Sequence, residues 1–83
     1  MTGGISGETE RIFQNLSAVL KASGKGFDDV VRAAVYLTNM SDYVTLNGIY
    51  AKHLSQPFPA RTVIGVAALP LGACVEIDLV VKA

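Results

Sequence analysis

The sequence predicts a small α+β domain in which two helices pack on one face of a mixed β-sheet, in the order α-β-α-β-β. Three observations lead to this prediction: a strong helical period near the N-terminus, three β-branched stretches with alternating apolar residues, and proline or glycine between the elements. At 83 residues the chain has the length of one domain.

The composition excludes several classes of function. The chain is 51% hydrophobic and 17% charged, with a mean hydropathy of +0.41, so we expect apolar surface to be buried against other subunits. Seven basic residues balance seven acidic ones without a basic run, which argues against nucleic-acid binding. With no membrane-spanning run and no signal peptide, we expect a soluble cytoplasmic protein. One cysteine (Cys74) and one histidine (His53) provide neither a disulfide nor a zinc site.

The first helix is predicted over residues 7–22. Ser6 is its predicted N-cap, and Glu8 and Glu10 lie in the first turn, where negative charge suits the helix dipole. The apolar stripe at helical spacing consists of Ile12, Phe13, Leu16, Val19 and Leu20. Gly24 is the predicted C′ residue.

The first strand is predicted over residues 30–37, which are β-branched and alternate. One face is expected to carry Val31, Ala33, Val35 and Leu37, and the other Val30, Arg32, Ala34 and Tyr36. Just before the strand, Asp28 and Asp29 can be interpreted as a carboxylate pair or as turn and capping residues. The turn preferences of aspartate favour the second interpretation.

The second helix follows a turn at residues 39–42, with Ser41 as its predicted N-cap. Its neighbouring turns carry Tyr43, Leu46, Asn47, Tyr50 and Leu54. The helix must stop before Pro57. His53 lies near its C-terminus, where we expect a surface residue compatible with the helix dipole; a catalytic role is the alternative.

Two further strands are predicted over residues 61–67 and 73–82, joined by a turn of hairpin length at residues 69–72. The faces of the second strand are Thr62, Ile64 and Val66 on one side and Arg61, Val63, Gly65 and Ala67 on the other. The third strand has an apolar face of Ala73, Val75, Ile77, Leu79 and Val81, and a mixed face of Cys74, Glu76, Asp78, Val80 and Lys82.

Two helices can cover only one face of the sheet, and we expect the all-apolar strand faces to meet them. The opposite face, which mixes charged and apolar residues, is predicted to be an oligomer interface made of Arg32, Tyr36, Arg61, Val63, Gly65, Ala67, Cys74, Glu76, Asp78 and Val80. Arg61 and Glu76 are expected to be cross-strand neighbours there. They form either a site, with Arg61 binding a carboxylate and Glu76 positioning water or transferring a proton, or an interface ion-pair network with Arg32 and Asp78.

Several stretches, in order and at matching spacing, resemble the Rid (reactive intermediate deaminase) family, also called the YjgF family. They are residues 8–20 with the following Ala-Ser-Gly, residues 27–32 (FDDVVR), 35–40 (VYLTNM), 42–50 (DYVTLNGIY) and 58–62 (FPART), Leu69-Pro70, and residues 75–78 (VEID). The resemblance covers nearly the whole chain, from about Ile5 to Val81, and this combination of motifs is specific.

The resemblance implies a chorismate-mutase-like fold and a homotrimer, or a multiple of it, with sites between subunits and no metal or organic cofactor. In active members, arginine at the position of Arg61 binds the substrate carboxylate, and glutamate at the position of Glu76 is associated with the attacking water. Tyr43 and Asn47 match pocket-lining positions. The implied reaction is hydrolysis of a 2-imino acid or enamine, such as 2-aminoacrylate, to the 2-oxo acid and ammonia.

Two departures from the family pattern bear on function. The family has N-terminal strands with a pocket tyrosine before the first helix; we expect these to be absent here, which exposes a sheet edge and favours an altered or swapped assembly. Val63 stands where the family often has cysteine. Two hypotheses follow: an imine deaminase using Arg61 and Glu76, or a non-catalytic oligomer that binds small carboxylates. Ribonuclease or translation-inhibitor activity, suggested for some members, is disfavoured by the neutral charge.

Overall fold

The computed structural model describes residues 4–54 and 58–82. Its helices and strands are α1 (Gly4–Ala22), β1 (Val30–Leu37), α2 (Tyr43–His53), β2 (Ala60–Gly65) and β3 (Val75–Val81). Short 3₁₀ turns precede β1, α2 and β3, at Phe27–Asp29, Met40–Asp42 and Pro70–Gly72. This order confirms the predicted α-β-α-β-β arrangement.

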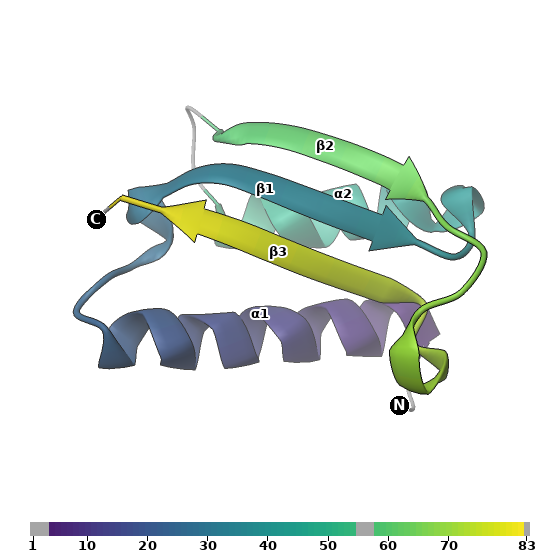
Figure 1. The fold of residues 1–83 in the computed structure, drawn as a ribbon, viewed down its shortest axis with the longest axis horizontal. Coiled ribbons are helices and arrows are strands. Elements are labelled where there is room, and N and C mark those ends of the chain that lie inside the picture. The colour runs from purple at the N-terminus through teal and green to yellow at the C-terminus, as the bar shows by residue number, and fades with distance from the viewer. Residues whose placement is uncertain (1–3, 55–57, 83) are drawn as a thin grey trace.

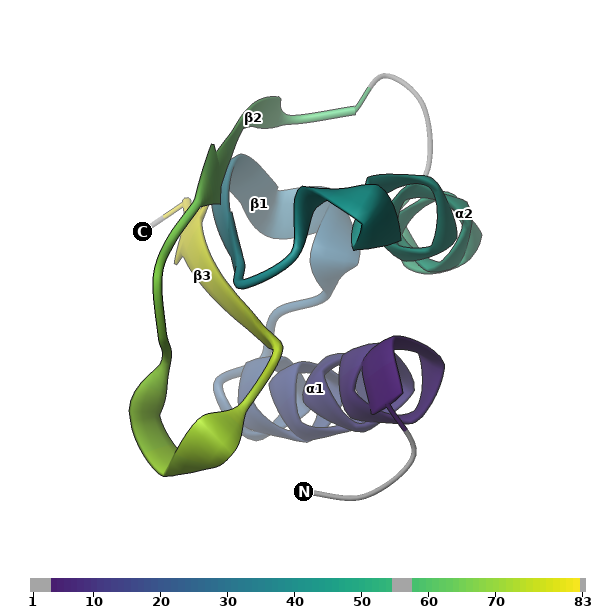
Figure 2. The same cartoon turned by 90° about the vertical axis from the view of Figure 1, so that its right-hand side faces the viewer.

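β1 is the central strand of a sheet with the order β2-β1-β3 (Figure 1). It pairs in parallel with β2 and antiparallel with β3, which confirms the predicted mixed sheet. Both helices lie on one face of this sheet, α2 on the side of β2 and α1 on the side of β3 (Figure 2). Because β1 lies between β2 and β3, residues 69–72 belong to a crossing connection and do not close the predicted hairpin.

The hydrophobic core fills the space between the sheet and the helices. Its fully buried members include Phe13, Ala33, Val35, Leu37 and Leu46. The predicted apolar face of β3 is confirmed for Val75, Ile77, Leu79 and Val81, which are buried in this core or pack against it. The strand is shorter than the predicted residues 73–82, and Ala73 precedes it. The predicted stripe of α1 is wrong at Val19, which is 64% exposed. At 3.6 residues per turn, Val19 points about 120° away from Phe13.

Both helix N-termini differ from the predictions. α1 begins at Gly4, so Ser6 lies inside its first turn and is not the N-cap. α2 begins at Tyr43, after a 3₁₀ turn that Asn39 caps. In that turn the Oδ1 atom of Asn39 accepts the backbone N–H of Ser41 at 3.0 Å. The N-cap of α2 itself is Asp42 and not the predicted Ser41.

The helix C-termini follow the predictions. Gly24 has a φ of +74°, and its N–H donates to the carbonyl of Lys21, as expected for a C′ glycine. α2 ends at His53, before Pro57, a residue that lies outside the described part of the chain. Neither described helix is both long enough and apolar enough to cross a membrane.

The start of β1 departs from strict alternation. A register shift between Val30 and Arg32 in the pairing with β3 buries Val30 and leaves Val31 exposed, the reverse of the prediction. Immediately before the strand, the Asp29 carboxylate accepts the N–H of Gly26 at 2.9 Å. This bond confirms the turn and capping interpretation for Asp29.

The face of β2 that was predicted to point away from the helices points toward them. Its parallel register pairs Ala33 with Arg61 and Val35 with Val63. Both β1 partners are fully buried on the helix side, and directly paired residues share a face of the sheet. Arg61 and Val63 therefore face the helices, whereas Ile64 is exposed on the outer face. β2 also ends two residues earlier than predicted.

Candidate functional site

A cleft of about 380 Å³ lies between α2 and β2. It is lined by Asn47, Tyr50 and Ala51 from α2, and by Phe58, Pro59 and Arg61 from β2 and the residues that lead into it. Most of these side chains are apolar or aromatic, and Arg61 is the charged one. A small, largely apolar cleft with a few convergent polar groups is typical of a small-molecule site.

α2 holds the Arg61 guanidinium at three points. Nη1 donates to Oδ1 of Asn47, and Nη2 donates to the hydroxyl of Tyr43 at 3.0 Å. The Cζ atom lies 4.7 Å from the centroid of the Tyr50 ring, which is within cation–π range. The four- and three-residue spacing of Tyr43, Asn47 and Tyr50 places them on one side of the helix. The structure thus brings together the predicted binding residues Arg61, Asn47 and Tyr43; their role remains a prediction.

Arg61 keeps free hydrogen-bonding capacity. A guanidinium has five N–H donors, and Asn47 and Tyr43 use one each. No carboxylate within residues 4–54 and 58–82 forms an ion pair with Arg61. Because the guanidinium is always charged, the cleft presents an oriented and uncompensated cation, which suits a carboxylate ligand.

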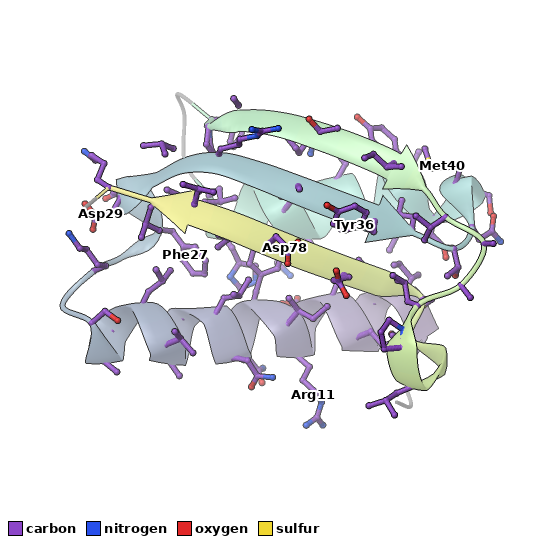
Figure 3. The ribbon with its side chains drawn as sticks, viewed as in Figure 1. Arg11, Phe27, Asp29, Tyr36, Met40 and Asp78 are labelled. Carbon is purple, nitrogen blue, oxygen red and sulfur yellow. The ribbon has the colours of Figure 1, made fainter. Side chains whose placement is uncertain are left out.

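Glu76 does not reach this cleft within one chain. It pairs with Tyr36 of β1 on the outer face of the sheet, the face on which Figure 3 shows Tyr36 and Asp78. β1 separates the two strands that carry Arg61 and Glu76. The prediction that Arg61 and Glu76 are cross-strand neighbours on one face is therefore wrong. Within one chain the described ion pairs do not include Arg32, Arg61, Glu76 or Asp78. The alternative ion-pair network, which was predicted at an interface between copies, stays a prediction.

Sequence reasoning missed two aromatic residues of the cleft, Tyr50 and Phe58. The ring centroids of Tyr50 and Phe58 lie 6.1 Å apart. Burial raises the pKa of the Tyr50 hydroxyl, and the charge of Arg61 only partly offsets this effect, so the phenol is neutral at physiological pH. The available signal was the spacing of Tyr43, Asn47 and Tyr50, which already placed Tyr50 on the helix face of two predicted pocket residues.

Cys74 forms hydrogen bonds with α1 and, contrary to the prediction, does not lie on the outer face of the sheet. It comes just before β3, which begins at Val75, so the alternation of side chains along that strand does not include it. Its backbone N–H donates to Oε1 of Glu8 at 2.9 Å, and its thiol donates to Oε2 at 3.0 Å. Burial and the Glu8 carboxylate raise the pKa of Cys74 to about 11. For Glu8 itself, burial acts to raise the pKa, but the two hydrogen bonds from Cys74 outweigh it and lower the pKa. The thiol is therefore protonated at neutral pH, and the pair fastens α1 to the start of β3.

His53 packs against α1 and is partly exposed, with 27% of its side chain accessible. Its ring stacks on that of Phe13 with centroids 4.6 Å apart, and its Nε2 lies 2.8 Å from Oε1 of Glu10. Lys52 donates to Oε2 of the same carboxylate at 2.8 Å. These contacts join the last turn of α2 to α1, and they leave His53 outside the residues that line the cleft.

The Glu10 contacts should make stability depend on pH in acid. Hydrogen bonds from Lys52 and then His53 lower the pKa of Glu10 below its ordinary value of 4.5. Such a carboxyl stabilises the fold above its unfolded pKa and loses this contribution as the pH falls through its lower folded pKa. In Glu10→Gln, the free energy of unfolding should therefore fall less steeply below about pH 5 than in the wild type.

Urea unfolding at successive pH values measures this slope. Glu8 titrates in the same direction, so Glu10→Gln should reduce the slope without abolishing it. Lys52→Met serves as a second variant, because it removes the larger cause of the pKa shift while Glu10 stays in place. A slope that is identical in the wild type and in Glu10→Gln contradicts the prediction.

The fold and the cleft together define a class of protein: a small α+β domain in which one arginine is held at a cleft between α2 and β2. The family model described as Endoribonuclease L-PSP matches residues 1–83. The chain belongs to this family, the Rid or YjgF family, as its motifs predicted.

Named relatives support this assignment. Reactive Intermediate Deaminase A, chloroplastic, from Arabidopsis thaliana is 41% identical over 76 residues, which are 92% of this chain and 41% of that protein. The 2-iminobutanoate/2-iminopropanoate deaminase of Dermatophagoides farinae is 40% identical over 98% of this chain and 63% of its own length. The chain thus spans roughly two to three fifths of these relatives.

Solved structures show the same fold. The crystal structure of RidA from the Antarctic bacterium Psychrobacter sp. PAMC 21119 superposes with a TM-score of 0.96 at 38% identity, over all of this chain and 68% of that one. Yeast Mmf1 gives a TM-score of 0.91 at 36% identity and is covered over 67% of its chain. The predicted two-helix, mixed-sheet fold is therefore confirmed. The names of relatives place them in chloroplasts and mitochondria, and the cytoplasmic location of this chain stays a prediction.

Proposed function

We propose that this protein is a Rid-type deaminase, which hydrolyses 2-imino acids and their enamine tautomers, such as 2-aminoacrylate, to 2-oxo acids and ammonia. The observation that supports it best is the Arg61 guanidinium, which α2 orients over a small apolar cleft with donors left free. Relatives that are 40% identical carry the name 2-iminobutanoate/2-iminopropanoate deaminase.

In this proposal Arg61 binds the substrate carboxylate through two parallel N–H···O bonds. The bound carboxylate places C2 in the cleft, between the walls that include Ala51 and Phe58. An enamine substrate such as 2-aminoacrylate first takes up a proton at C3 and becomes the 2-imino acid. A water molecule then adds to C2 while the imine nitrogen takes up a proton. The resulting amino alcohol then releases ammonia and leaves the 2-oxo acid. Imines hydrolyse readily, so orienting the substrate and the water can supply much of the acceleration.

Glu76 is the proposed residue that positions this water, and it must come from a second copy of the chain. A carboxylate can act on the water only from within hydrogen-bond reach, and within one chain Glu76 and Arg61 lie on opposite faces of the sheet. We therefore propose a homo-oligomer, with the trimer as the first candidate, in which Glu76 of one copy approaches the cleft of another. Exposed apolar residues on the outer face, Ile64 and Val80, are consistent with such an interface.

A mixing experiment tests the proposed function and its division between copies. 2-Aminoacrylate is generated in situ, and the appearance of pyruvate is followed with wild type, Arg61→Ala, Glu76→Gln, and oligomers refolded from equal amounts of the two variants. We expect both variants to be inactive alone. For a site that takes one residue from each copy, random mixing restores about one quarter of the wild-type rate.

Each other outcome has a definite meaning. If wild type accelerates the reaction and mixing restores nothing, Arg61 and Glu76 do not act across copies. If folded wild type gives no acceleration, the deaminase proposal fails. Glu76→Gln is close in volume to the original residue, which limits any loss to the carboxylate chemistry.

A second candidate function is a non-catalytic oligomer that binds small carboxylates through the same arginine. It is favoured by the position of Glu76, which leaves the cleft of a single chain without a carboxylate from β3. Binding of 2-oxobutanoate in calorimetry, together with no acceleration of imine hydrolysis, selects this function over the deaminase.

A further inference from the structure

Tyr50 stands apart from the other cleft residues because it belongs to both the cleft and the core. It lines the cleft beside Arg61, yet it is only 3% exposed. Its ring packs edge-on against Phe13 of α1, with centroids 6.2 Å apart, and contacts Phe58 on the cleft side. The ring therefore has little freedom to move.

The Arg61 guanidinium lies over this fixed ring. The distance of 4.7 Å from Cζ to the ring centroid is shorter than the 5.7 Å to the ring of Tyr43, so Tyr50 is the closer π-surface. A cation over an aromatic face is attracted by the ring quadrupole, and the attraction grows as water is excluded. Asn47 and Tyr43 hold the Arg61 guanidinium at its two terminal nitrogens, and the Tyr50 ring contacts the guanidinium from a third side.

The hydroxyl of Tyr50 has no part in this arrangement. It is buried and has no hydrogen-bond partner among residues 4–54 and 58–82. A buried hydroxyl without a partner costs stability. The contribution of Tyr50 to the site must therefore come from its ring.

We propose that Tyr50 is the positioning residue of the cleft: its ring holds the Arg61 guanidinium in the orientation that binds a carboxylate, and so sets the affinity for the ligand. This inference rests on the proposed carboxylate-binding role of Arg61. An arginine without such support samples many rotamers, and ordering it on binding costs free energy. Resting on a ring that the core already immobilises, Arg61 is ordered before the ligand arrives.

A fluorination series tests the proposal without changing the shape of the site. Tyr50 is replaced by phenylalanine, and then by 4-fluoro-, 3,5-difluoro- and 3,4,5-trifluorophenylalanine, and binding of 2-oxobutanoate is measured by calorimetry. Fluorine withdraws charge from the ring face while the ring stays in place. We expect affinity for 2-oxobutanoate to fall stepwise from Tyr50→Phe along the fluorinated series, by roughly three- to thirtyfold in total.

Two further readouts separate positioning from a merely structural role. Tyr50→Phe should raise the midpoint of urea unfolding or leave it unchanged, because it removes an unpaired buried hydroxyl. Tyr43→Phe is the matched control, because it removes a hydrogen bond to Arg61 and leaves the ring at position 50 in place. It should weaken binding by the same factor whichever ring stands at position 50. Affinity that stays constant along the fluorinated series overturns the proposal.

A ligand-free measurement keeps this inference distinct from the proposed function. Protons of the Arg61 side chain over the Tyr50 ring should show ring-current shifts in NMR spectra, and these shifts should be retained in Tyr50→Phe and lost in Tyr50→Leu. If wild type binds no 2-oxo acid but the shifts behave in this way, the carboxylate-binding function fails while the positioning geometry stands. If the shifts are absent from the wild type, the positioning proposal itself is wrong.

Discussion

Replacing Arg61 by alanine should remove carboxylate binding and any imine hydrolysis that depends on it. Among the described residues, the guanidinium is the one charged group that lines the cleft, and its free donors have no carboxylate partner there. Loss of a charge-assisted, two-point contact with a ligand carboxylate should weaken binding by about a hundredfold or more. Calorimetry with 2-oxobutanoate measures the binding, and pyruvate formation from 2-aminoacrylate measures the reaction.

Arg61→Lys is the matched control because it keeps the charge and changes its shape. An ammonium group cannot donate as a planar fork, and it cannot satisfy Asn47 and Tyr43 while binding a carboxylate at two points. We expect Arg61→Lys to bind more weakly than the wild type and more tightly than Arg61→Ala. Equal affinity of Arg61→Ala and wild type excludes Arg61 as the anchor, and equal affinity of Arg61→Lys and wild type shows that only its charge matters.

Local pattern was sufficient for most of the fold. β1 has the predicted bounds because its β-branched, alternating residues stand between clear turn signals. The end of α1 was predictable because Gly24 adopts a positive φ that other residues avoid. The start of α1 was not, because Ser6 is a good cap in isolation but the helix continues to Gly4. Propensity is a weak guide to a helix end when neighbouring residues can also adopt helical geometry.

The site was only partly predictable for a different reason. Alternation predicts which residues of β2 share a face with Arg61, but not which face turns toward the helices. The charge of Arg61 suggested an outward direction, whereas the parallel register with β1 turns it inward, next to Asn47 of α2. The relation of Arg61 to Glu76 was wrong because β1 lies between their strands. That insertion is a long-range feature of topology, and a short connecting segment in the sequence does not reveal it.

Replacing Phe13 by alanine should cause the largest loss of stability of any variant considered. Phe13 is fully buried, and its ring contacts those of Phe27, Tyr50 and His53, at centroid distances of 5.8, 6.2 and 4.6 Å. Deleting a buried phenylalanine side chain costs about 3–5 kcal/mol, through lost burial and the cavity left behind. A domain of this size has a total stability on the order of 5 kcal/mol, so Phe13→Ala should be partly or fully unfolded at 25 °C.

Phe58→Ala is the matched control, because it deletes the same side chain from a position that is 44% exposed. Urea unfolding followed by circular dichroism should show a loss for Phe58→Ala that is much smaller than for Phe13→Ala. Phe13→Leu, which keeps most of the buried volume, should be intermediate. Equal losses at positions 13 and 58 contradict the assigned core.

Phe13 also supports the ring of Tyr50 beneath Arg61. Phe13→Leu should therefore weaken 2-oxobutanoate binding even where the protein stays folded. An exposed substitution on α1, such as Val19→Ala, should leave this binding unchanged.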